Sequence, residues 1–336
     1  QEALDLYEGA GFPRGESDTL GNIGGVHLLL GRYQQALDYY QRALAISESL
    51  ESRPSMSLDH GNMAQCYLGL GEVDMALEHF DIALQLAVET GMRKEEALWK
   101  RGKGNALIRK GQYDLGLDAH RAALATYEEI NARGLLVDSL HDMGRLHLDL
   151  GDPVSAKRYF LNALELAREI GLTQAVTVNL LSLGDLHFIR ENFEEAAALY
   201  GQASERSTTA GELGYQAESL LRLALTERQL SGFEQSEANT RRALSLGKEI
   251  NAAFVLAKAW YILGELERQK GNIEAAVLHF NSAQNTLEET GDPGLLWQIH
   301  YGRGLAHAAK GDREDAIKEL QAAITIIESV RERVRE

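Results

Sequence analysis

Residues 31–43 read GRYQQALDYYQRA, and residues 71–83 read GEVDMALEHFDIA. In both stretches a glycine is followed by alanine five and twelve positions later, and by an aromatic residue nine positions later. Related spacings recur every 40 residues, so that eight units lie in phase along the 336-residue chain. A fixed period of this length is typical of solenoids, in which each repeat packs on its neighbours. We therefore expect a binding or regulatory surface rather than a catalytic pocket.

Each unit predicts a first helix, a tight turn and an antiparallel second helix. The turn positions are occupied by Gly31, Gly71, Gly111, Gly151, Glu191, Ser231, Gly271 and Gly311. Glycine also recurs inside the first helices, as at Gly24 and Gly184. Because glycine costs about 1 kcal/mol relative to alanine inside a helix, its recurrence indicates a neighbouring backbone that passes too close for a side chain.

The second helices are expected to stop at residues that tolerate the left-handed conformation. These residues are Gly11, Gly91, Asn131, Gly171, Gly211, Asn251 and Gly291. Glu51 stands at the one remaining position, where we expect Ser52–Arg53–Pro54 to end the helix instead.

The pattern resembles the tetratricopeptide repeat (TPR) family. Its core motif is matched by Gly31, Tyr33, Ala36, Tyr40 and Ala43, and its leading Trp and Leu-Gly pair by Trp260, Leu263 and Gly264. The resemblance implies an all-α, right-handed superhelix of antiparallel helix pairs. The period of 40 exceeds the usual value of about 34, which indicates longer helices. HEAT and armadillo repeats share a period near 40 but not this spacing of small residues, so we rank them second.

We interpret residues 1–336 as one solenoid of about eight repeats, with turns near residues 31, 71, 111, 151, 191, 231, 271 and 311. Residues 1–14 are expected to be the tail of a truncated repeat, because Ala3 and Leu4 are in phase with Ala43 and Leu44. Residues 325–336 are expected to be a helix that leads into a missing C-terminal domain; the alternative is a charged capping helix. Neither end offers the polar cap that solenoids need, so both could support self-association.

The last repeat resembles that of bacterial proteins in which such repeats precede a CHAT domain, a caspase-like cysteine protease module. The matching residues are Ala323, Ile324, Ile327, Glu328 and Arg331. This resemblance implies the sensor or regulatory part of a larger bacterial effector. Similar arrays also serve as sensor arms of NTPase-coupled switches and of transcription regulators, and both alternatives stay open.

Composition restricts the function classes further. The net charge of −16 disfavours nucleic acid and anionic membranes as partners. No apolar run reaches the roughly 20 residues that a membrane-spanning helix needs. The single cysteine, Cys66, cannot form an internal disulfide and is expected to be a buried structural thiol, which fits a cytoplasmic location.

Motifs for catalysis are missing from the sequence. There is no phosphate-binding loop, no H-E-x-x-H, no paired-cysteine zinc spacing and no G-x-S-x-G. Most of the 10 histidines share repeat positions, as His27, His147, His187 and His307 do, which predicts packing or surface roles rather than metal binding. We therefore expect no enzyme activity, no catalytic residue, no metal and no cofactor.

The resemblance implies that the first helices line a concave groove. The candidate ligand-binding residues, carried over by repeat position, are Asn22, Asn62, Gln65, Arg101, Asn105, Arg109, His141, Arg145, Asp185, Arg222, Arg228, Lys258, Tyr261 and Arg268. Asparagine can hold the backbone of an extended peptide, and arginine suits carboxylates. Arg228 and Arg268 occupy equivalent positions and should stack as a short ladder. The alternative to ligand contact is local pairing with Glu227, Glu265 and Glu267.

The leading hypothesis is a non-catalytic sensor or adaptor that binds a protein or peptide segment in this groove and controls a C-terminal effector domain. The alternative is a passive scaffold whose ends stack into an oligomer. Binding of chaperone tails is not expected, because the Lys/Asn set of the carboxylate clamp cannot be matched across three successive repeats.

Overall fold

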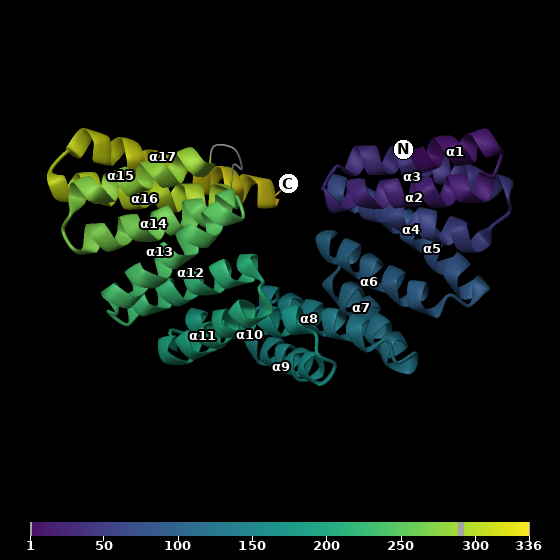
Figure 1. The fold of residues 1–336 in the computed structure, drawn as a ribbon, viewed down its shortest axis with the longest axis horizontal. Coiled ribbons are helices and arrows are strands. Elements are labelled where there is room, and N and C mark those ends of the chain that lie inside the picture. Colours follow the sequence, from purple (N-terminus) through teal and green to yellow (C-terminus); the bar gives the residue numbers. More distant parts are fainter. Residues whose placement is uncertain (1, 288–291, 336) are drawn as a thin grey trace. The chain divides into compact units, whose positions relative to one another are not determined.

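The computed structural model describes residues 2–287 and 292–335, and all regular structure within them is helical (Figure 1). The predicted all-α class is therefore confirmed. The chain divides into two compact units, Gln1–Tyr159 and Phe160–Glu336, with the boundary inside α9. No helix in the described part of the chain has the length and apolar character needed to cross a bilayer.

The first unit holds α1 and a series of helix pairs. Its helices are α1 (Glu2–Ala10), α2 (Pro13–Leu29), α3 (Tyr33–Ser49), α4 (Arg53–Leu70), α5 (Val73–Thr90), α6 (Arg93–Arg109), α7 (Tyr113–Glu129), α8 (Arg133–Asp149) and the first part of α9 (Pro153–Glu169). The even-numbered helices are the first helices of the pairs, and α2, α4 and α6 each pack closely on the helix that follows.

The second unit continues the same alternation. After the last part of α9 come α10 (Thr173–Ile189), α11 (Phe193–Ala210), α12 (Leu213–Gln229), α13 (Phe233–Glu249), α14 (Ala253–Gln269), α15 (Ile273–Leu287), α16 (Pro293–Lys310) and α17 (Arg313–Arg335). The helices pair as α10 with α11, α12 with α13, α14 with α15 and α16 with α17.

The turns show why the repeat tolerates residues other than glycine at its helix ends. Glu51, Glu191 and Ser231 adopt the left-handed conformation, with φ of 51°, 60° and 62°. The prediction that Ser52–Arg53–Pro54 replaces the stop at residue 51 is therefore wrong. Glu51 takes the left-handed turn itself, and the Ser52 amide donates to the Ser47 carbonyl at 2.9 Å, which closes the helix end. Gly291 lies outside the described residues.

Aromatic rings explain the glycines inside the first helices. A Cβ at Gly24 would lie 3.0 Å from the Tyr40 ring, and one at Gly184 would lie 2.5 Å from the Tyr200 ring. The close neighbour is thus usually a ring of the second helix and not, as the sequence suggested, a backbone. At Gly104 the backbone does come close, since a Cβ there would lie 3.1 Å from the Gly116 carbonyl oxygen. These contacts fix each helix pair and leave its outer positions open to variation.

Candidate functional site

The candidate residues from the sequence share one structural position. All 14 lie on first helices, namely α2, α4, α6 and α8 in the first unit and α10, α12 and α14 in the second. Their side chains are exposed or partly buried, so all are accessible to some degree. We call these 14 residues the first-helix face, and we describe it separately for each unit.

In the first unit, four of these residues line a single cavity of about 290 Å³. Gln65 comes from α4, and Arg101, Asn105 and Arg109 come from α6. Because successive first helices lie side by side, the cavity places two amide groups and two guanidinium groups around one space. Asn22, Asn62, His141 and Arg145 do not line it.

Hydrogen bonds hold these polar groups in place. Arg109 donates to the Leu68 carbonyl at 2.6 Å, and the Asn105 Oδ1 lies 3.0 Å from His120 Nε2. Arg101 makes a longer contact of 3.4 Å with Asp142 on α8. Burial raises the pKa of Asp142, although Arg101 opposes this shift. Of the three, Arg101 is held by the longest contact and is best placed to change partner.

Two glycines and two aromatic rings complete this cavity, and the sequence analysis missed all four. A Cβ at Gly102 would lie 2.5 Å from the Phe80 ring, and one at Gly69 would lie 2.5 Å from the Tyr33 ring. All four residues are part of the cavity lining. The available signal was Gly69, because no other repeat has glycine at its position; Gly102 shares its repeat position with Gly302. A glycine that breaks the phase marks a local close approach.

In the second unit, Arg222 joins two neighbouring first helices. Its guanidinium contacts Asp185 on α10 at 2.9 Å and Glu218 on α12 at 2.5 Å. Tyr200 also donates to Asp185, at 2.6 Å. Burial opposes the charge of Arg222, but the two carboxylates outweigh this effect and raise the pKa of the guanidinium. The cluster is therefore a charged network that links α10 to α12.

Lys258 lies at the edge of a second, mostly apolar cavity of about 420 Å³ between α12 and α14. Leu221, Ile250 and Phe254 are among its apolar lining residues. The Lys258 ammonium lies 5.9 Å from the centre of the Phe254 ring. Burial, and then the nearby Arg222 charge, lower the pKa of Lys258. This cavity pairs an apolar wall with a partly desolvated cation.

Arg228 and Arg268 share one carboxylate. Both guanidinium groups contact the buried Glu265, at 3.0 Å and 2.9 Å. Glu265 is one of the local partners that the sequence analysis offered as the alternative to ligand contact. Burial and the Glu265 charge raise the pKa of Tyr261 to about 12, so its hydroxyl stays protonated at neutral pH.

Two family models described as tetratricopeptide repeats match the sequence, one over residues 1–49 and 95–169 and the other over residues 257–285 and 298–329. The chain is a tetratricopeptide repeat array. No curated protein gives a significant match.

Several solved structures resemble this TPR array in fold. The apo form of RapI is 13% identical with a TM-score of 0.72, over 93% of this chain and 86% of that one. PH0952 from Pyrococcus horikoshii, a signal transduction ATPase with a TPR sensor, is 16% identical with a TM-score of 0.70, over 95% of this chain and 49% of that one. The Rap conjugation regulator of plasmid pLS20, solved with the Phr* peptide, is 13% identical with a TM-score of 0.60, over 94% of this chain and 96% of that one. Identities this low show the fold alone.

One cluster of a histidine and two aspartates in the TPR array has the spacing of metal ligands. In the described residues, His307, Asp312 and Asp315 place ligand atoms within 4.8 Å of one another. The Lys310 ammonium, however, lies 3.5 Å from the Asp312 carboxylate and already supplies a positive charge there.

Cys66 is fully buried, and burial raises the pKa of its thiol to about 12, so the thiol is neutral at physiological pH.

Proposed function

We propose that this TPR array is a non-catalytic binding domain whose first-helix face holds a peptide or an extended protein segment. The observation that carries the proposal is the cavity of about 290 Å³ that Gln65, Arg101, Asn105 and Arg109 line together. Four predicted residues from two helices thus surround one space.

The chemistry of this cavity suits an extended peptide. The amides of Gln65 and Asn105 each carry a donor and an acceptor, which matches the alternating groups of a peptide backbone. Arg101 can offer a carboxylate a charge-assisted hydrogen bond when it leaves its 3.4 Å contact with Asp142. The partly buried ring of Tyr33 lines the same cavity and provides an apolar surface for a side chain.

The similar solved structures support the proposed peptide-binding role through their shared fold. The pLS20 Rap regulator was solved with a peptide, and the repeats of PH0952 are described as a sensor. We extend the proposal to a sensor or regulatory role in a larger, cytoplasmic bacterial protein. The link to a CHAT effector rests on the residues of the last repeat alone, and an NTPase-coupled switch or a transcription regulator is an equal alternative.

A random peptide library tests the proposal without a known ligand. Heptapeptides displayed on phage are selected against the full chain, and the affinities of the enriched peptides are then measured as synthetic peptides by fluorescence anisotropy. Arg101→Glu reverses a charge in the cavity, so we expect at least a tenfold loss of affinity, the size of one charge-assisted contact.

Arg121→Glu is the matched control. Arg121 is an exposed arginine on α7 that pairs with Asp118 at 3.0 Å, so its reversal changes the net charge equally but leaves the cavity intact. Enrichment of no peptide, or equal losses in both variants, would contradict the proposal. Light scattering on the same samples tests the passive-scaffold alternative, which requires an oligomer that grows with protein concentration.

A further inference from the structure

One cavity in the second unit lies away from the first-helix face. It has a volume of about 520 Å³ and is lined by the last part of α9, the first part of α10 and the last part of α11. Arg168 and Arg206 contribute positive charge, and Glu205 contributes one carboxylate. Val176 and Leu180 border the cavity but are almost fully buried. None of the 14 candidate residues lines it.

Arg206 is anomalous in the repeat. The other residues at its repeat position are Ile46, Leu86, Thr126, Leu166, Leu246, Thr286 and Ile326. A guanidinium therefore stands where the other repeats have an aliphatic side chain or threonine. The Arg206 Nε is buried and has no hydrogen-bond partner among the described residues. A buried donor without a partner costs free energy, and the Arg206 side chain also lines the cavity.

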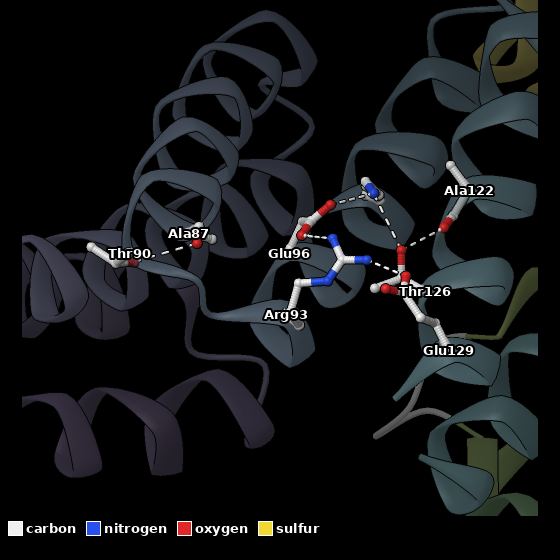
Figure 2. A network of polar contacts seen from close by, with 8 residues as sticks. Ala87, Thr90, Arg93, Glu96, Ala122, Thr126 and Glu129 are labelled. Carbon is white, nitrogen blue, oxygen red and sulfur yellow. Dashed lines mark hydrogen bonds and ion pairs between the residues drawn. The ribbon is translucent and has the colours of Figure 1, made fainter. Parts of the chain in front are cut away.

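The equivalent place in the first unit is filled by protein side chains. Figure 2 shows this place, where Arg93 contacts both Glu96 and Glu129. The Lys100 ammonium bonds to Glu96 at 2.5 Å and to the Thr126 hydroxyl at 3.2 Å. Two carboxylates and two cations thus satisfy one another at this position.

The repeat period relates the two places directly. Eighty residues, two periods of 40, separate each network residue from its counterpart. The counterparts of Arg93, Glu96, Lys100, Thr126 and Glu129 are Thr173, Val176, Leu180, Arg206 and Thr209. Both carboxylates are therefore replaced by neutral side chains, and the shorter residues leave open space. Arg206 enters that space without an ion pair to any described residue.

We propose that this cavity binds a small organic anion whose carboxylate or phosphate head contacts the Arg206 guanidinium. Arginine binds both head groups through paired, charge-assisted hydrogen bonds. Arg168 adds a second positive charge at an exposed position, so the two arginines outweigh the exposed Glu205. A volume of about 520 Å³ lies within the range of small-molecule sites.

The backbone supports the same assignment. Thr173 is the first residue of α10 and lines the cavity, and the residue before it, Leu172, provides no side-chain cap. The first amide groups of a helix favour a nearby anion. The cavity therefore combines an arginine whose Nε has no partner among the described residues with a helix start that has no side-chain cap.

Isothermal titration calorimetry of the full chain with two probes tests whether the cavity binds an anion. Inorganic phosphate and hexanoate are titrated separately at low salt, and we expect saturable one-to-one binding of at least one of them. Binding of hexanoate alone assigns a carboxylate ligand, and binding of phosphate alone assigns a phosphorylated ligand. Failure of both probes to bind overturns the inference.

Variants locate the binding. Arg206→Leu restores the residue of three other repeats and should weaken binding at least tenfold, as expected for loss of a charge-assisted pair. Arg242→Leu removes an exposed arginine of α13 and should leave the affinity unchanged. Equal affinities of Arg206→Leu and the unmodified chain would overturn the assignment.

A second variant covers the case in which Arg206→Leu does not fold. Thr209→Glu adds a carboxylate three residues after Arg206 on α11, where it can pair with the guanidinium. It should weaken binding of the probe by a similar factor. Undiminished binding in Thr209→Glu would contradict the proposed position of the anion.

Discussion

Two equivalent places in the repeat array, one beside α6 and the other beside α10, differ in what fills them. Beside α6, charged side chains of the protein satisfy one another, as Figure 2 shows. Beside α10, neutral residues replace both carboxylates, and a cavity of about 520 Å³ remains. The helices themselves begin and end at matching residues, since α6 and α10 both span 17 residues.

The difference shows how a repeat separates folding from function. Ala123 and Ala203 are fully buried at equivalent positions, and Gly104 and Gly184 each admit a side chain of the following helix. These small residues fix the helix pair in both places. The residues of the network differ between the two places while these small residues are kept, so the same kind of helix pair can surround either an ion-pair network or a cavity.

The largest expected effect on stability comes from disrupting the ion-pair network beside α6. Glu96 is 7% exposed and receives bonds from both Arg93 and Lys100. Glu96→Gln keeps the shape but removes the charge that both cations face, so we expect a loss of about 2 kcal/mol in the free energy of unfolding. Urea denaturation measures it, with hydrogen exchange of α6 and α7 to locate the effect.

Glu129→Gln is the comparison variant. Glu129 contacts the same Arg93 but is 64% exposed, so its loss should cost no more than about 0.5 kcal/mol. Equal losses in the two variants would mean that burial does not decide the strength of this network.

The contribution of Glu96 to the free energy of unfolding should depend on pH. Burial alone would raise the pKa of Glu96, but the bonds from Lys100 and Arg93 outweigh it and hold the pKa below 4.5. A lowered pKa in the folded chain means that Glu96 contributes stability above pH 4.5, and that this contribution disappears as the pH falls through the lowered value. The gap in unfolding free energy between the unmodified chain and Glu96→Gln should therefore shrink on acidification. A gap that stays constant down to about pH 3 would contradict the charge assignment.

A smaller effect on stability is expected when the ion pair found beside α6 is introduced into the cavity beside α10. Thr173→Arg combined with Thr209→Glu copies Arg93 and Glu129 into α10 and α11. Because this pair is exposed in the first unit, the gain in stability should be only about 0.5 kcal/mol. Thr173→Arg alone is the control, since it adds the cation without the carboxylate. A gain in the control equal to that in the double variant would show that no pair forms.

The sequence predicted the helix pairs well because the repeat contacts involve small residues at fixed spacing. It also identified Gln65, Arg101, Asn105 and Arg109, which the structure brings to one cavity. It failed at Glu51, where a helix end adopts the left-handed conformation without glycine or asparagine.

The anion-binding cavity was beyond the sequence analysis for a physical reason. Its volume depends on the combined absence of long side chains at Thr173, Val176 and Thr209, which lie on two different helices. None of these residues is unusual alone. Arg206 was the available signal, since a charged residue at an aliphatic repeat position is visible in the sequence.

A crystal structure of the full chain grown with hexanoate and phosphate tests the central claim most directly, because both places are seen in one experiment. We expect an anion within hydrogen-bonding distance of Arg206 beside α10, and an unchanged network of Arg93, Glu96 and Lys100 beside α6. An anion bound beside α6, or a cavity beside α10 that holds none while the crystal is saturated with both, would contradict it.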